Sequence, residues 1–222
     1  MSGPVSTIRW WLVRHAPTPE AAGRIVGRLD IGCDLGDAGA LDALARALPA
    51  GALWLTTPLR RAGATARALA ERSGERPRPQ PREEPGLAEQ DFGAWQGSTW
   101  DELAAGDTDG AVRRFWRDAA ASRPPGGESF ADLAARVAEA LVRRSPEAVT
   151  QAEGPHDVVA VCHGGPIRAA LALALGIAPE RALAFEIEPL SLTRIDRIEP
   201  EHGPACWRVA GVNLPPCPLV RT

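Results

Sequence analysis

The chain has 222 residues, which fits one domain of ordinary α/β size and suffices to bury an apolar core without disulfide or metal staples. Its hydrophobic content of 45% and charged content of 24% are typical of a soluble globular protein. The formal net charge of −3 provides no overall basic field, so composition argues against a nucleic-acid partner. We expect one domain over residues 1–222, with a core of about 8–200 followed by C-terminal strands and an irregular tail.

The cysteines and the first residues bear on the compartment. The four cysteines show no CxxC spacing and form no zinc-site pattern with the four histidines. Free thiols in a reducing cytosol are therefore expected, which places the protein in the cytoplasm. Residues 1–9 lack a basic stretch followed by an apolar core, so we expect no export signal. Since no apolar run is long enough to span a bilayer, we expect no membrane partner.

Two short apolar runs, each followed by a histidine, predict buried parallel strands. The run Ile8–Val13 leads into Arg14 and His15, and the run Asp157–Cys162 leads into His163. Prolines and glycines follow each histidine and stop the strand. A third continuous apolar run at 52–56 is also consistent with a buried parallel strand.

Apolar residues at spacings of three and four predict four helices after these strands. Each predicted helix begins with a residue suited to a cap or a first turn. In chain order these residues are Asp37, Thr57 with Pro58, Ser129 with Asp132 as a capping box, and Pro166. Glycines at 51, 74 and 176 end three of the helices.

The remaining segments are less strongly patterned. Residues 76–85 are rich in proline and charge, which predicts an extended surface connection with room for a short edge strand. Residues 100–123 are helical with weak periodicity, and 191–197 with 206–210 predict a final hairpin. The alternation of strands and helices predicts a three-layer α/β/α sandwich with a mostly parallel central sheet.

Parallel α/β sheets bind their ligands in the crevice outside the carboxyl ends of the strands. His15 and His163 both follow strand ends, and Arg14 stands beside the first of them. Two imidazoles with a neighbouring guanidinium suit a small anion. The sequence therefore predicts an anion site at this edge of the sheet.

Two further segments offer polar groups to such a site. Arg60 and Arg61 fall in the first turn of a predicted helix, where an arginine beside free backbone N–H groups can hold a phosphate. Solvent exposure explains Arg60 well, but periodicity does not choose between the two. Glu89 lies in the segment Leu87–Gly97, which mixes carboxylates, aromatics and glycines without a regular period. Such loops often carry function, although composition alone favours a solvated loop carboxylate as the interpretation of Glu89.

Together these segments resemble the histidine phosphatase superfamily, also called phosphoglycerate mutase-like. The matching stretches, with the family pattern after each, are VRHAPT at 13–18 (RHG), TPLRRAGATA at 57–66 (SPLxRAxxTA), LAEQDFGAWQG at 87–97 (LxExxFGxWEG), GES at 127–129, and VCHGG at 161–165 (the second-histidine motif). Each motif alone is weak to moderate, but all of them in order form a strong signal over about residues 8–200. The resemblance selects Arg61 and Glu89.

The resemblance implies hydrolysis of a phosphomonoester through a phosphohistidine. His15 would be the nucleophile, and Glu89 would act as general acid and then as general base. Arg14, Arg61 and His163 would hold the phosphoryl oxygens. The further phosphate contacts implied are Thr18, Gly27 and Gly164. With so many fixed cations, we expect no metal and no other cofactor.

Three positions depart from the family pattern. Ala16 replaces the usual glycine after the nucleophile, which makes the backbone there less permissive. Ala21 stands where a phosphate-contacting asparagine is common, so one oxygen contact is missing or supplied elsewhere. Gln96 replaces the glutamate of the WEG element. None of these changes removes an assigned chemical role.

The first loop bears on the substrate, which we expect to be a small phosphorylated metabolite. The stretch GRLDIGCDL at 27–35 resembles the GRxDxxL segment of α-ribazole phosphatases. The competing interpretation is a structural turn in which Leu35 packs and Asp30 caps a helix. Three tryptophans, Trp95, Trp100 and Trp116, could floor an apolar substrate pocket, but at this spacing tryptophans more often belong to a core.

Two other function classes stay open. A mutase-type phosphotransferase is one, although the compact region between Glu89 and His163 favours hydrolysis. A non-catalytic phosphate-binding module is the other. The complete set of nucleophile, acid and cations argues against it, because that set is what turnover needs. A second copy of the chain, forming a homodimer, is a further candidate partner.

Overall fold

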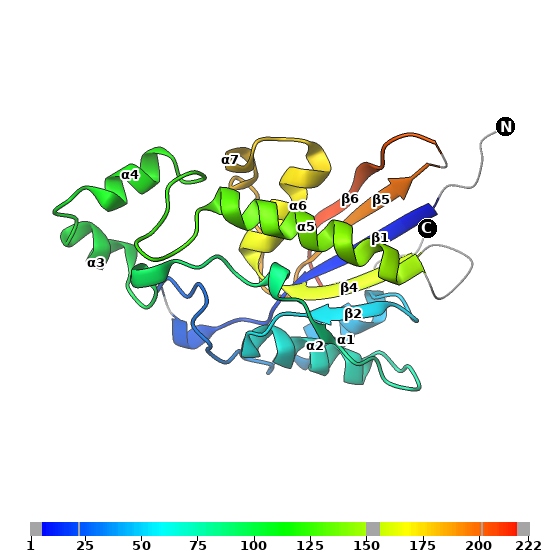
Figure 1. Cartoon of the computed structure of the whole chain (residues 1–222). Helices are drawn as coiled ribbons and strands as arrows, with labels where there is room; N and C mark the ends of the chain where they lie inside the picture. Colours follow the sequence, from blue (N-terminus) through cyan, green and yellow to red (C-terminus); the bar gives the residue numbers. More distant parts are fainter. Residues whose placement is uncertain (1–5, 22, 150–155, 201, 217–222) are drawn as a thin grey trace.

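The computed structural model describes residues 6–21, 23–149, 156–200 and 202–216 (Figure 1). A six-stranded sheet forms its centre in the order β3-β2-β4-β1-β5-β6. The strands are β1 (Ser6–Arg14), β2 (Leu53–Thr56), β3 (Arg82–Glu83), β4 (His156–Cys162), β5 (Leu192–Glu199) and β6 (Cys206–Leu214). The pairs among β3, β2, β4 and β1 are parallel, and β5 and β6 add an antiparallel edge.

Helices cover both faces of this sheet, which makes the three-layer α/β/α sandwich predicted from the sequence (Figure 1). On one face lie α1 (Ala38–Ala47) and α2 (Arg60–Arg72), and on the other lie α5 (Phe130–Val149), α6 (Gly164–Leu175) and the short α7 (Pro179–Ala182). The short helices α3 (Trp100–Ala105) and α4 (Ala111–Arg117) project beyond one end of the sheet. No helix in the described part of the chain is long and apolar enough to cross a membrane.

The apolar strands are buried on both faces, as their continuous hydrophobic runs predict. In β1, Ile8, Trp10 and Leu12 join the core cluster beneath α5 and α6, whereas Val13 joins the cluster beneath α1 and α2. Burial on both faces fixes the register, because a slip of one residue would move every side chain to the wrong layer. The ends of β1 and β4 are therefore aligned, with Arg14 opposite Cys162.

The predicted starts of two helices are confirmed. Asp37 caps α1 through a hydrogen bond of 2.8 Å from the Ala40 N–H to its side chain. Before α5, the Ser129 hydroxyl accepts from the Asp132 N–H at 3.1 Å, and the Asp132 carboxylate accepts from the Ser129 N–H at 2.8 Å. Both bonds of the predicted capping box are present.

The predicted starts of two other helices are wrong. Helix α2 begins at Arg60, two residues after Pro58, and Thr57 is not its cap. Asp30, far away in sequence, accepts a hydrogen bond of 2.7 Å from the Arg60 N–H and so satisfies the first turn. Helix α6 begins at Gly164, which puts Pro166 at its third position rather than its first.

The structure also shows what the weakly patterned segments form. Residues 76–85 form an extended connection that contains the edge strand β3. Two of the three tryptophans, Trp95 and Trp100, belong to a small apolar cluster with α3 and α4, which supports the core interpretation, whereas Trp116 is 59% exposed. The predicted hairpin is the antiparallel pair β5–β6. Within the predicted irregular tail, residues 217–222 lie outside the described residues.

Candidate active site

The register of β1 and β4 brings the two predicted histidines together. His15 follows Arg14 and donates its backbone N–H to the Cys162 carbonyl at 3.0 Å, which places it beside the end of β4. The rings of His15 and His163 have centroids 5.1 Å apart, and both side chains are buried. One tetrahedral anion can therefore reach both imidazoles.

The hydrogen bond at one ring nitrogen of His15 determines its tautomer. Nδ1 lies 2.7 Å from the Ala16 carbonyl oxygen, which can only accept, so Nδ1 carries the hydrogen and Nε2 keeps its lone pair. Burial first, and then the charges of Arg61 and Arg14, lower the pKa of His15 to about 3, although the Ala16 hydrogen bond acts in the other direction. The ring is thus a neutral imidazole with a nucleophilic nitrogen at physiological pH.

The second histidine has one partner and one open nitrogen. Nε2 of His163 lies 2.9 Å from the Thr57 hydroxyl, and Nδ1 is buried without a hydrogen-bond partner among the residues that the structure describes. Burial is the largest cause that holds the pKa of His163 well below its usual value, and the nearby cationic groups add to it. A buried polar atom without a partner is costly, so this nitrogen is suited to meet a ligand.

Of the two candidate arginines, Arg61 is the one at the site. Its side chain is 1% exposed, and its Nε donates to His15 Nε2 at 3.2 Å. The guanidinium is held by the carbonyls of Leu29, at 2.8 Å, and Gly27, at 2.7 Å. Arg60 points outward and pairs with Asp30, as solvent exposure predicts.

Gly27 is required by the turn that holds this arginine. Its φ is +51°, a conformation that favours glycine, and a Cβ there would lie 2.3 Å from the Gln96 side-chain oxygen and 3.0 Å from the Gln90 carbonyl. The Gln96 side-chain oxygen also accepts from the Arg28 N–H at 2.5 Å. Gln96, which replaces the glutamate of the family pattern, therefore helps to hold the same turn. Gly27 thus acts on the site through its carbonyl, and its phosphate contact stays a prediction.

The other predicted cation, Arg14, is also held by a main-chain carbonyl. Its Nη1 donates to the Ile187 carbonyl at 2.5 Å, and its Nε is buried without a partner among the described residues. Burial lowers the pKa of Arg14, whereas the charge of Glu89 raises it. The Arg14 Nε would lie 3.9 Å from a Cβ on Gly164, so this guanidinium faces the first turn of α6.

Glu89 reaches the same helix end from the loop between the 3-10 turns η2 (Pro85–Leu87) and η3 (Gly93–Trp95). Its Oε1 accepts from the Gly165 N–H at 3.1 Å and from the Gln90 N–H at 2.9 Å. A helix N-terminus stabilises negative charge, so α6 fixes this carboxylate beside the cations. The structure therefore brings Arg14, His15, Arg61, Glu89 and His163 to one place.

The other predicted positions have plainer surroundings. The Thr18 carbonyl accepts from the Ala21 N–H at 3.0 Å in the 3-10 turn η1 (Pro19–Ala21), and the phosphate contact of Thr18 stays a prediction. Positive φ at non-glycine residues occurs, within the described ranges, at Leu190 and Asn213, so Ala16 fits its position without strain. The described residues hold no group of three His, Cys, Asp or Glu suited to a metal ion.

Sequence reasoning missed one side chain in this cluster. The Thr57 position reads locally as a helix cap, whereas its hydroxyl binds His163 across a separation of 106 residues. The strand–turn–helix pattern of this segment could not reveal that contact, because it depends on how β2 and β4 pair. The TP sequence before the arginines, which the family pattern shares as SP, was the available signal.

Comparison with known proteins agrees with this geometry. The family profile of the histidine phosphatase superfamily (branch 1) matches residues 10–211, and the chain belongs to this family. The fold and the family make it a phosphatase, as expected from the motifs.

The relatives differ in how much they share with this chain. Glucosyl-3-phosphoglycerate phosphatase of Mycobacterium tuberculosis is 41% identical over 173 residues, which cover 74% of this chain and 73% of that protein. A structure of the mycobacterial enzyme has a TM-score of 0.74 and 32% identity, covering 94% of this chain and 99% of the other. The α-ribazole phosphatase of Shigella flexneri has a TM-score of 0.76 over 96% of this chain and all of its own, but at 22% identity it shows only a shared fold.

Proposed function

We propose that this phosphatase hydrolyses a small phosphorylated metabolite through a phosphohistidine on Nε2 of His15. The observation that carries the proposal is the neutral His15 ring, whose Nδ1 is tied to the Ala16 carbonyl and whose Nε2 faces Arg61. A neutral nitrogen next to fixed cations is what attack on a phosphomonoester dianion needs. Because His15 and His163 are buried, little solvent is present to weaken the electrostatic stabilisation of a phosphoryl group bound between them.

In the first step, Nε2 attacks phosphorus while the bond to the ester oxygen breaks. Glu89 in its protonated form gives its proton to the leaving oxygen, and the alcohol departs. In the second step, Glu89 takes a proton from water, the water oxygen attacks phosphorus, and the bond to Nε2 breaks. Phosphate leaves, and His15 is again neutral.

Three groups are suited to the phosphoryl oxygens during transfer. The unpartnered Nε of Arg14 and Nδ1 of His163 gain partners when an anion enters, and Arg61 can turn its Nε from His15 to an oxygen. With Thr57 donating to Nε2 of His163, Nδ1 of that ring carries a hydrogen to donate. The N-terminus of α6 at Gly164 adds a positive partial charge.

For the substrate we favour a glucosylated 3-phosphoglycerate, because the relatives at 41% identity are glucosyl-3-phosphoglycerate phosphatases. The first-loop motif gives α-ribazole 5′-phosphate little support, since Asp30 caps α2 and Leu35 packs against the core, as the structural interpretation of that loop predicts. A panel of both compounds, assayed for phosphate release with and without a bisphosphate activator, separates these substrates from a mutase.

The test of the mechanism is the His15→Ala variant. We expect it to lose phosphate release from p-nitrophenyl phosphate by about a thousandfold or more while keeping its thermal unfolding transition. His202→Ala, which removes an exposed histidine, is the control and should behave as the wild type. Rapid acid-free quenching with labelled substrate should trap a phosphoenzyme in the wild type and in His202→Ala, but not in His15→Ala. Unchanged turnover in His15→Ala would show that His15 is not the nucleophile.

A further inference from the structure

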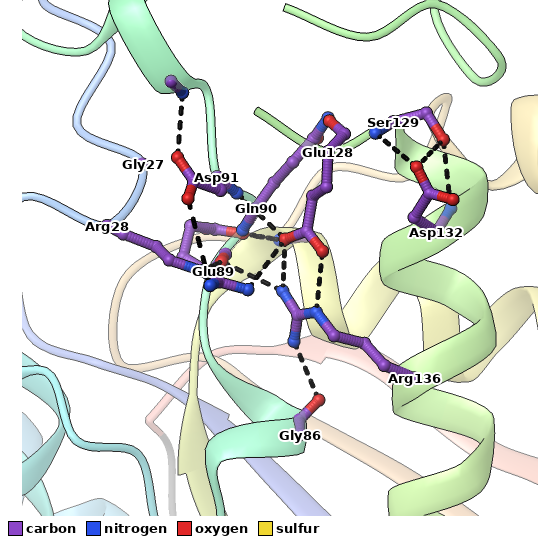
Figure 2. A network of polar contacts seen from close by, with 12 residues as sticks. Gly27, Arg28, Gly86, Glu89, Gln90, Asp91, Glu128, Ser129, Asp132 and Arg136 are labelled. Carbon is purple, nitrogen blue, oxygen red and sulfur yellow. Dashed lines mark hydrogen bonds and ion pairs between the residues drawn. The ribbon is translucent and has the colours of Figure 1, made fainter. Parts of the chain in front are cut away.

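Two arginines outside the site described above converge on the main chain of the proposed acid. The carbonyl oxygen of Glu89 accepts from Arg28 Nε at 3.2 Å and from Arg136 Nη2 at 3.0 Å (Figure 2). Arg28 comes from the first loop and Arg136 from α5, so two distant elements meet at one peptide group. A carbonyl that accepts two charged donors is held more firmly than one with a single neutral partner.

Glu128 joins these two arginines. Its carboxylate accepts from Arg136 through Nε at 3.0 Å and Nη2 at 2.7 Å, and from Arg28 through Nη2 at 3.1 Å (Figure 2). The same carboxylate accepts from the Asp91 N–H at 2.9 Å. The Glu128 main chain adds two more bonds to this segment, to Gln90 and Asp91, at 3.0 and 2.9 Å.

These contacts hold the main chain of the acid and of the two residues after it. Residues 89, 90 and 91 each make at least one bond to Glu128 or to an arginine that Glu128 holds. The Glu89 carboxylate itself meets the Gly165 N–H. The backbone of Glu89 is thus fixed by Arg28 and Arg136, while its side chain extends toward α6.

The turn at residues 27–29 connects these contacts around Glu89 with Arg61, one of the groups proposed to bind the phosphate. The carbonyls of Gly27 and Leu29 orient Arg61, and the side chain of Arg28, between them, reaches Glu89 and Glu128. One turn of three residues therefore touches both the cation beside the nucleophile and the main chain of the acid. A purely structural ion pair would not need to connect these two groups.

We propose that Glu128, acting through Arg28 and Arg136, is a positioning residue that aligns Glu89 with the leaving-group oxygen. This inference rests on the proposed role of Glu89 as general acid. Glu128 supplies the one carboxylate that both guanidiniums share, so its loss leaves two neighbouring cations without that counter-charge. They then repel each other, and the half-exposed Arg28, which is then paired with the Asp91 carboxylate at the longer distance of 3.9 Å, moves away from the Glu89 carbonyl.

The test compares leaving groups that differ in their need for a proton. An alkyl phosphate such as glycerol phosphate needs the acid, whereas p-nitrophenyl phosphate has a good leaving group and needs it little. Glu89→Gln sets the reference pattern, a large loss for the alkyl ester and a small one for the aryl ester. We expect Glu128→Gln to copy this pattern, with kcat for the alkyl phosphate lower by about 10- to 100-fold, the aryl rate within about threefold, and KM unchanged.

Asp196→Asn is the matched control, because it also removes the charge of a carboxylate held by two arginines. Arg194 and Arg208 bind Asp196 on β5 and β6. This variant should lose stability without changing the ratio of alkyl to aryl rates. Should Glu128→Gln fail to fold, Arg28→Met provides a second test, because that side chain is 39% exposed. We expect the same selective loss with a smaller magnitude.

The outcomes separate this inference from the proposed function. If Glu89→Gln shows no preference between leaving groups, the acid role itself is wrong and the inference is overturned with it. If Glu89→Gln shows the preference while Glu128→Gln and Arg28→Met lower both rates equally, or lower neither, only the positioning role is overturned. Selective loss in Glu128→Gln with an intact fold supports both.

Discussion

The arginines at the site are oriented by main-chain carbonyls. Arg61 donates to Gly27 and Leu29, and Arg14 donates to Ile187. The nearby Arg168 donates to the Phe185 carbonyl in the same way, at 2.7 Å. A carbonyl fixes the direction of a guanidinium without neutralising it, so the charge remains available to a phosphate dianion.

At the residue scale, Gly165 offers a sharp prediction. A Cβ at this position would lie 2.2 Å from Oε1 of Glu89 and 3.0 Å from Cδ2 of Leu133, so Gly165→Ala must push the carboxylate away from α6. We expect the alkyl phosphate rate to fall by about 10- to 100-fold, since a displacement near 1 Å has that effect on a reacting group. Steady-state kinetics on both ester types measures the change.

Gly39→Ala is the matched control for this prediction. Gly39 is the second residue of α1, as Gly165 is of α6, and a Cβ there would lie 3.5 Å from the Asp37 carboxylate, an ordinary contact. This variant should be as active as the wild type and as stable or slightly more so, because alanine favours a helix. Wild-type kinetics in Gly165→Ala would mean that the Glu89 carboxylate does not need its place at the helix end.

The residues of the site were predictable to the extent that local sequence determines them. His15 and His163 each follow an apolar run, and the carboxyl ends of parallel strands lie at one edge of the sheet, so their place at that edge follows from the pattern. The pairing of β1 with β4, which makes the two rings neighbours, is found only in the structure. The choice of Arg61 over Arg60 came from the family motif. The roles of Thr57, Arg28 and Arg136 depend on contacts with residues 106, 61 and 47 positions away in the sequence, respectively. No local sequence pattern could have predicted these contacts.

At the element scale, the start of α2 shows what a distant cap does. Asp30 binds the Arg60 N–H, and its carboxylate also pairs with the Arg60 side chain. The local sequence favoured a start at Thr57 and Pro58, both good first-turn residues, but the Thr57 hydroxyl serves His163 instead. Element types were therefore predictable from periodicity, whereas this boundary was determined by tertiary contacts.

The role of this cap can be measured. Asp30→Ala should lower the free energy of unfolding by about 1 kcal/mol, the usual cost of losing a side-chain cap, as seen in urea denaturation. The ratio of rates on glucosyl-3-phosphoglycerate and on α-ribazole 5′-phosphate should stay the same, because the loop motif serves the helix. Asp34→Ala, which affects a bond within its own turn to Gly36, should cost less. A changed substrate ratio in Asp30→Ala would show that the loop contributes to selectivity.

At the scale of the whole molecule, the sheet is the frame that makes the site possible. Its strands β1 and β4 are buried between two helical layers, and their shared end carries two histidines that are almost without solvent. The helices α3 and α4, which project beyond this same end of the sheet, build a separate aromatic cluster that includes Trp95 and Phe115 (Figure 1). The site thus lies where the two main layers end, and burial there is imposed by the global packing.

This burial makes the stability of the whole protein depend on pH. An unfolded histidine has a pKa near 6.5, whereas folding lowers the pKa of His15 to about 3 and holds that of His163 well below its usual value. Between these values the unfolded chain binds more protons than the folded one, so the free energy of unfolding rises with pH. The stabilisation is complete above about pH 6.5 and is lost as the pH falls through the window below it.

We therefore expect the free energy of unfolding in urea to fall between about pH 7 and pH 5, by up to about 1.4 kcal/mol per pH unit for each histidine. The lowered pKa values of Glu84 and Glu128 act in the same direction only at lower pH, near the usual carboxyl range, so the two effects are separable. Replacing His15 and His163 by asparagine should flatten the dependence above pH 5, whereas His202→Ala should leave it unchanged. An equally steep slope in the double variant would mean that these two rings are not the groups that gain protons when the chain unfolds.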